Sequence, residues 1–203
     1  MAATRRTSTD IALIAGFAAL VAACALLPGV PVGPLGVPIT LQTFAVMLAG
    51  AVLGSTRGFL AVALYVVAGL AGLPIFSGGA SGLGVLAGPT AGYLLAFAPA
   101  AWLCGAVVER LPRHQLATSV PLVFLAGWFS SLALIHTCGI AVLVTRFDLT
   151  WSEAFLADLP FWPGDVVKNL VMAVVATAVH RAFPDLLPRR TGREPVVPTH
   201  EPA

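Results

Sequence analysis

Two ionisable side chains of complementary chemistry, Asp165 and Lys168, lie in an apolar stretch near the C-terminus. Their i, i+3 spacing places both on one face of a helix, where they are potential partners. A carboxylate accepts hydrogen bonds and an ammonium group donates them, so Asp165 can accept N–H groups of a small solute and Lys168 can donate to a carbonyl or a carboxylate. Because ionisable groups are costly inside a bilayer, they are functional candidates. The alternative is an ion pair that only neutralises itself, although such a pair gains little stability over apolar residues.

The composition around this pair is that of a membrane protein. Of the 203 residues, 58% are hydrophobic and only 10% are charged, whereas soluble domains have about 45–50% and 25%. No Asp, Glu, Lys or Arg occurs in residues 11–56 or 58–108, and stretches of this kind are typical of membrane-spanning helices. A soluble globular protein is therefore excluded. The net charge of +2 gives no reason to expect a nucleic-acid partner.

The helices that must position the pair are predicted from the places where glycine, proline and polar clusters interrupt the apolar stretches. We expect an all-α polytopic membrane protein with six transmembrane helices, at residues 11–27, 41–53, 59–73, 91–108, 121–144 and 161–182. The second and third spans are only about 20–24 Å long, so either flanking polar residues lengthen them or neighbouring helices shield them. The expected units are an N-terminal segment (1–10), a six-helix domain (11–182) and a disordered tail rich in proline and arginine (183–203).

The arginines predict the orientation of these spans. Arg146 alone falls on one side of a six-span path. The other side holds Arg5, Arg6, Arg57, Arg110, Arg113, Arg181, Arg189, Arg190 and Arg193. Because basic residues favour the cytoplasmic side, both termini are expected in the cytoplasm. Asp165 and Lys168 then lie roughly 6 and 10 Å below the outer end of their helix.

Other patterns favour neither an enzyme nor a cofactor site. The Gly-Lys dipeptide of a phosphate-binding loop is absent, because the only lysine follows Val167. The cysteines lie far apart, without His at metal-ligand spacing, at positions 24, 104 and 138. His136 is interpreted as a hydrogen-bonded residue of the helix bundle. We therefore expect no catalytic residue, no metal and no cofactor.

The N-terminus allows two interpretations. Residues 21–24 resemble a lipoprotein cleavage box, which would remove the first span and lipidate Cys24. The apolar run continues past this box to Leu27, with no polar start of a mature chain. We therefore expect an uncleaved first span.

Two further segments carry functional hypotheses. Residues 72–93 contain seven glycines together with aliphatic and aromatic side chains; a disordered loop would be more polar, so we expect a re-entrant lid over an outer pocket. Alanines spaced four apart in the first span permit close helix contact, either within the bundle or with another membrane protein. One stripe consists of Ala15, Ala19 and Ala23, and Ala18 and Ala22 lie beside it.

These motifs together resemble those of the BioY family, the biotin-binding membrane components (S components) of energy-coupling factor transporters. The similarity covers residues 10–182 and is carried by residues 37–43 (VPITLQT), 78–93 (ending GPTAGY) and 164–168 (GDVVK). The resemblance implies a six-helix bundle in the bacterial cytoplasmic (inner) membrane that captures biotin from the outer side. It also implies a transmembrane coupling protein and ATPase subunits as partners, besides the membrane lipid. An A-x-x-x-A pattern in the first helix would dock the coupling protein, and 15/19, 19/23 and 18/22 all fit it.

The resemblance places Asp165 and Lys168 at the substrate. Further candidates for substrate binding come from the outer segments: Gln42, Thr43, Ser77, Gly79, Ser81 and Tyr93. The biotin carboxylate has two candidate partners, either Lys168 or the backbone N–H groups of the lid with Ser77 or Ser81. We favour the lid, which leaves Asp165 and Lys168 for the ureido ring, whose N–H and C=O match an acceptor and a donor.

The expected function is high-affinity capture of biotin for uptake, energised by separate ATPase subunits because this chain has no nucleotide loop. The alternative is a self-sufficient proton-coupled vitamin carrier in which Asp165 relays protons. A membrane enzyme is a third hypothesis, and no catalytic constellation supports it.

Overall fold

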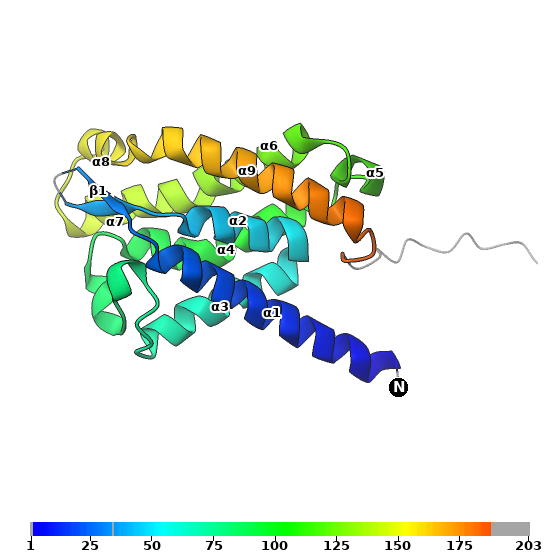
Figure 1. Cartoon of the computed structure of the whole chain (residues 1–203). Coiled ribbons are helices and arrows are strands. Elements are labelled where there is room, and N and C mark those ends of the chain that lie inside the picture. The colour runs from blue at the N-terminus through cyan, green and yellow to red at the C-terminus, as the bar shows by residue number, and fades with distance from the viewer. Residues whose placement is uncertain (1, 34, 188–203) are drawn as a thin grey trace, which may run out of the picture.

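The computed structural model describes residues 2–33 and 35–187, and this part of the chain is mostly helical (Figure 1). A hairpin of two short strands and two 3₁₀ turns complete it: β1 (Val30–Val32), β2 (Val37–Ile39), η1 (Ser77–Gly79) and η2 (Leu83–Ala87). The helices are α1 (Ala2–Leu26), α2 (Gln42–Leu53), α3 (Ser55–Leu70), α4 (Ala91–Val108), α5 (Arg113–Leu116), α6 (Val120–Ser130), η3 (Ser131–His136), α7 (Thr137–Arg146), α8 (Trp151–Asp158) and α9 (Phe161–Ala182).

Four helical stretches of the described chain are long and apolar enough to cross a membrane: Thr7–Leu26, Ala91–Val108, Val120–Arg146 and Phe161–Ala182. The third of these is one continuous run of α6, η3 and α7, with π-helical geometry in η3. Two further apolar helices, α2 and α3, have only 12 and 16 residues. The chain is thus a multi-pass membrane protein, and the count of six spans stays a prediction.

The short helix α2 is the best-shielded helix of the bundle. Residues 45–53 of α2 are all buried, as is Gln42 at its start. Close packing depends on glycine: a Cβ at Gly50 would lie 2.2 Å from the carbonyl oxygen of Ala101 in α4, and one at Gly58 in α3 would lie 2.8 Å from the Cα of Gly50. Neighbouring helices therefore cover α2 closely, which is one of the two arrangements expected for a span of this length.

The two ends of the bundle differ in what they contain (Figure 1). The antiparallel hairpin, α8 and the segment between α3 and α4 gather at one end, which we call the hairpin end. We call residues 71–90, between α3 and α4, the lid segment. The N-terminus of α1 and the last turns of α9 lie at the other end, which we call the opposite end.

The chain termini differ in part from the sequence prediction. The predicted segment 1–10 and the first span form one helix from Ala2, because nothing in residues 2–10 breaks a helix. Beyond α9, residues 183–187 form turns, and Leu187 is buried. The rest of the predicted tail, residues 188–203, lies outside the described residues.

Candidate functional site

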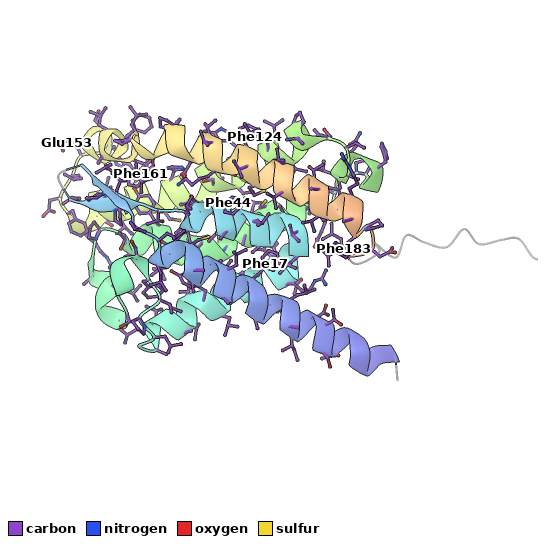
Figure 2. All side chains as sticks on the ribbon, viewed as in Figure 1. Phe17, Phe44, Phe124, Glu153, Phe161 and Phe183 are labelled. Carbon is purple, nitrogen blue, oxygen red and sulfur yellow. The ribbon has the colours of Figure 1, made fainter. Side chains whose placement is uncertain are left out.

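A cavity of about 200 Å³ lies at the hairpin end, between the hairpin, the lid segment and the helices α2, α4 and α9. Its polar lining residues are Thr40, Gln42, Thr43, Ser77, Thr90, Tyr93, His136, Asp165 and Lys168. Its apolar lining residues are Val37, Pro38, Phe76, Ala80, Val85, Leu94, Phe97, Ile135 and Phe161. Phe161, labelled in Figure 2, begins α9 close to the hairpin. A mostly apolar cavity with a few polar groups is typical of a small-molecule site.

The two side chains predicted to be neighbours, Asp165 and Lys168, form an ion pair through Asp165 Oδ1. Both residues are buried, with 2% and 8% exposure. Thr43 of α2 donates a hydrogen bond to the same oxygen over 3.0 Å, and Lys168 Nζ donates to the carbonyl of Thr40 over 3.1 Å. The ion pair is therefore held from both sides, by α2 and by the end of the hairpin.

This arrangement leaves hydrogen-bonding capacity toward the cavity. A carboxylate has about four acceptor positions and an ammonium group three donors. Oδ1 of Asp165 has two partners, and Oδ2 faces His136 Nε2 at 3.1 Å. Counting the described partners, one acceptor position on Oδ2 and one N–H of Lys168 are left. The pair therefore suits a ligand that offers an N–H beside a C=O.

A second buried carboxylate, Asp158, lies behind the ion pair and is fully enclosed. Tyr93 donates its hydroxyl hydrogen to Oδ1 over 2.9 Å, and the indole N–H of Trp162 donates to Oδ2 over 2.8 Å. His136 Nδ1 lies 2.8 Å from the same Oδ2. His136 thus joins the two carboxylates, Asp158 behind the cavity and Asp165 in its wall.

The short helix α8 carries Asp158 as its last residue. A capping box begins this helix: the backbone N–H of Glu153 donates to Thr150, and Glu153 accepts from the backbone and hydroxyl of Thr150. These bonds to the carboxylate lower the pKa of Glu153. A capping box satisfies backbone groups at the start of a helix, so it helps to define the segment that presents Asp158.

The lid segment is folded and covers part of the cavity. Phe76 is its buried anchor and packs edge-on against Tyr65, with ring centroids 5.4 Å apart. Gly69 makes room for this ring, since a Cβ there would lie 2.2 Å from it. Arg146 of α7 donates to the carbonyl of Leu86 and ties the lid segment to α7.

The structure brings together most of the predicted site residues. Those that line the cavity are Asp165, Lys168, Gln42, Thr43, Ser77 and Tyr93. Gly79 and Ser81 lie in the lid segment but are exposed and are not among the lining residues. Gln42 has its amide fixed, because its Nε2 donates to Tyr65 over 2.7 Å and its Oε1 accepts from Thr40 over 2.9 Å.

Sequence reasoning did not identify Asp158 and Trp162, and it interpreted His136 as a bundle residue. Asp158 lies outside the six predicted spans and Trp162 lies at the start of the sixth, yet the carboxylate and the indole are hydrogen-bonded at i, i+4 spacing. A lone histidine in an apolar span was the available signal for His136, because a buried imidazole needs polar partners. Its partners lie in other helices, so sequence spacing did not reveal them.

Comparison with known proteins gives consistent results. The model of the BioY family matches residues 1–185. A biotin transporter BioY of Rhizobium etli is 40% identical over 186 residues, covering 91% of this chain and 99% of the relative. One of Rhodobacter capsulatus is 41% identical over 192 residues, covering 88% and 96%. The crystal structure of the S-component for biotin from an ECF-type ABC transporter has the same fold, with a TM-score of 0.82 and 24% identity, covering 87% of this chain and 93% of that one.

Proposed function

We propose that this chain, which belongs to the BioY family, captures biotin in the cavity at the hairpin end as the substrate-binding component of a transporter. The observation that carries the proposal is the Asp165–Lys168 pair, which keeps one acceptor and one donor position in a cavity whose lining surface is mostly apolar. The relatives in Rhizobium etli and Rhodobacter capsulatus, both described as biotin transporters, support the choice of ligand.

The chemistry of biotin fits these groups. Its ureido ring has N–H donors beside a carbonyl acceptor, so Asp165 Oδ2 accepts an N–H and Lys168 donates to the carbonyl. The sulfur-containing ring and the aliphatic chain then contact the apolar lining, which includes Phe76, Phe97 and Phe161. Two fixed polar contacts in an apolar cavity orient a ligand of this shape.

The carboxylate of biotin is proposed to lie at the lid segment, against Ser77 and backbone N–H groups. Ser77 lines the cavity, whereas Ser81 is exposed outside it. Lys168 already has Asp165 and the Thr40 carbonyl as partners. Arg146 is bonded to the lid backbone and is not a lining residue. The lid is therefore the better-placed partner.

The proposed topology has six spans, with the hairpin end outside and both chain termini in the cytoplasm of a bacterial inner membrane. The arginines of the opposite end support this orientation, because Arg57, Arg110 and Arg181 belong to that end and Arg146 to the hairpin end. Residues 1–10 and 183–203 would be cytoplasmic, and residues 11–182 would form the membrane domain. Substrate would then enter from outside, where the cavity lies.

Transport would require a transmembrane coupling protein and ATPase subunits, and α1 offers the docking surface for the coupling protein. Ala15, Ala19 and Ala23 are exposed, whereas Ala18 is buried against the bundle. We therefore assign the exposed stripe, which consists of Ala15, Ala19 and Ala23, to contact with the coupling protein. Small side chains allow a partner helix to approach the backbone closely.

The proton-coupled carrier is the competing function, and α9 gives it little support. Thr177 and His180 are buried near the opposite end of this helix. Between them and the ion pair, however, lie the buried apolar residues Met172, Ala173 and Ala176. A proton relay requires a chain of polar groups or water. Asn169 is buried next to the ion pair, but from residue 170 to 176 the buried face of α9 offers no polar group.

Calorimetric titration of the purified protein with biotin in detergent tests the proposal. Saturable binding is expected for the wild type. Asp165→Asn and Lys168→Ala should each weaken binding by about tenfold or more, the effect of losing a charged hydrogen bond. Asp148→Asn is the matched control, because this carboxylate is exposed and is not a lining residue, and it should bind as the wild type does. A folded wild type that does not bind biotin would remove the proposed function.

A further inference from the structure

His136 occupies an unusual position between two buried carboxylates. Its Nδ1 lies 2.8 Å from Asp158 Oδ2, and its Nε2 lies 3.1 Å from Asp165 Oδ2. The exposed fractions of the three side chains are 3%, 0% and 2%. Water therefore has little access to this cluster. Nδ1 is hydrogen-bonded to Asp158, whereas Nε2 faces Asp165 at ion-pair distance without a hydrogen bond of good geometry.

The two carboxylates around the imidazole ring favour one of its protonation states over the other. A neutral imidazole has one N–H donor and one nitrogen lone pair. One ring nitrogen would then direct its lone pair at a carboxylate oxygen. A doubly protonated ring instead presents an N–H to each carboxylate.

The surroundings of His136 support the doubly protonated form. Asp158 already accepts from Tyr93 and from the indole of Trp162, which can only donate. It therefore behaves as an acceptor toward the imidazole as well.

The charge of the whole cluster follows from this arrangement. Asp158 and Asp165 contribute two negative charges, and Lys168 contributes one positive charge. An imidazolium at His136 makes the sum zero, whereas a neutral imidazole leaves one net negative charge. Three members of this cluster, Asp165, Lys168 and His136, line the cavity. No other described lining residue carries a charge. The proton on His136 therefore decides the net charge that a ligand meets.

We propose that His136 is an imidazolium that neutralises the site and so determines specificity: it favours a neutral ureido head group and disfavours a cationic one. Asp158 is the positioning residue, because it holds Nδ1 and thereby aims Nε2 at Asp165. This inference rests on the proposed function of the cavity. It also explains why the protein buries a second carboxylate, Asp158, although Asp158 does not line the cavity.

Competition between biotin and 2-iminobiotin tests the proposal. In 2-iminobiotin the ureido group is replaced by a cyclic guanidine, which is cationic at neutral pH, while the rest of the molecule is unchanged. The wild type should prefer biotin. His136→Gln leaves one net negative charge, so the affinity ratio should shift toward 2-iminobiotin by at least about tenfold.

Asp158→Asn is the matched variant. It removes a negative charge, so the cluster becomes neutral or positive, and the affinity ratio should not shift toward 2-iminobiotin. A general disturbance of the cavity would weaken both ligands alike in both variants, and that result would overturn the proposal. If the wild type binds neither ligand, the proposed function fails instead.

A second measurement applies to the unmodified protein. The chain has four histidines, and ¹⁵N NMR of histidine-labelled protein in detergent distinguishes protonated from unprotonated ring nitrogens. Substituting the other three histidines one at a time (His114, His180 and His200) identifies the His136 signals by elimination. Both His136 nitrogens should be protonated at neutral pH. A signal from a neutral tautomer would overturn the proposal, whether or not His136→Gln folds.

Discussion

Glu109 and Arg57, at the opposite end of the bundle, bind the protein's own backbone, whereas Asp165 and Lys168 at the hairpin end face a cavity. Glu109 accepts from the backbone N–H of Ser55 over 2.7 Å at the start of α3. Arg57 donates to the carbonyls of Leu53 and Leu186 and pairs with Asp10, which is 47% exposed. Asp165 and Lys168 are both buried, yet they keep hydrogen-bonding capacity toward the cavity. The difference indicates that the first set stabilises helix ends and the second binds a ligand.

Removing both charges at the hairpin end should separate binding from stability most clearly. We expect Asp165→Asn combined with Lys168→Met to weaken biotin binding by more than about 100-fold, because two charged hydrogen bonds are lost. The unfolding temperature should stay the same or rise, since a buried ion pair adds little over neutral groups of similar size. Calorimetry and thermal unfolding in detergent measure the two effects. A large loss of stability would mean that the pair is structural, like the charges at the opposite end.

A bulky residue on the exposed face of α1 should affect transport and leave binding intact. Ala19→Leu is expected to lower biotin uptake by cells by about tenfold, the effect of a steric cost near 1.4 kcal/mol at a close helix contact. Biotin binding by the purified chain should not change, because α1 does not line the cavity. Ala18→Leu, on the buried side, is the comparison and should destabilise the chain itself. Equal loss of uptake and binding in Ala19→Leu would place this stripe within the bundle.

Glu109→Gln should lower the stability of the protein and leave biotin binding intact, which is the reverse of the effect expected for the cavity variants. It loses charged hydrogen bonds to Ser55, so we expect it to lower the free energy of unfolding by about 1–3 kcal/mol. The affinity of the folded protein for biotin should be unchanged. Thermal unfolding with a parallel titration checks both statements. Weakened biotin binding without loss of stability would contradict the distinction between stabilising charges at the opposite end and ligand-binding charges at the hairpin end.

The capping box of α8 gives the smallest expected effect. The pKa of Glu153 is lowered in the folded protein, so its bonds to Thr150 stabilise α8 at neutral pH and are lost as the pH falls through the lowered value. Hydrogen exchange of α8 amides, corrected for intrinsic rates, should show protection that declines in acid. Glu153→Gln should lack this decline. The same acid response in both proteins would assign the pH dependence to another group.

The elements that sequence analysis located well are those defined by composition and helix breakers. The predicted spans 91–108 and 161–182 match α4 and α9, because a proline or a polar residue interrupts the apolar run close to each of their ends. The sequence also placed Asp165 and Lys168 on one helical face, since i, i+3 spacing is a local property. Local spacing and apolar length therefore predict both the helices and the ion pair.

The remaining parts of the site depend on tertiary contacts. The hairpin pairs Pro31 with Pro38, and proline-rich segments give no clear strand signal. The link from Asp158 through His136 to Asp165 joins α8, η3 and α9. Only the packing of these three elements creates it, so no pattern along the chain predicts it.

The structure of the chain with biotin bound is the most direct test of the central claim. The account predicts a ureido N–H within about 2.7–3.2 Å of Asp165 Oδ2 and the ureido carbonyl at a similar distance from Lys168 Nζ. The carboxylate should lie at Ser77 and the lid backbone. Biotin bound in the reverse direction, with its carboxylate on Lys168, or bound outside this cavity, would contradict the account.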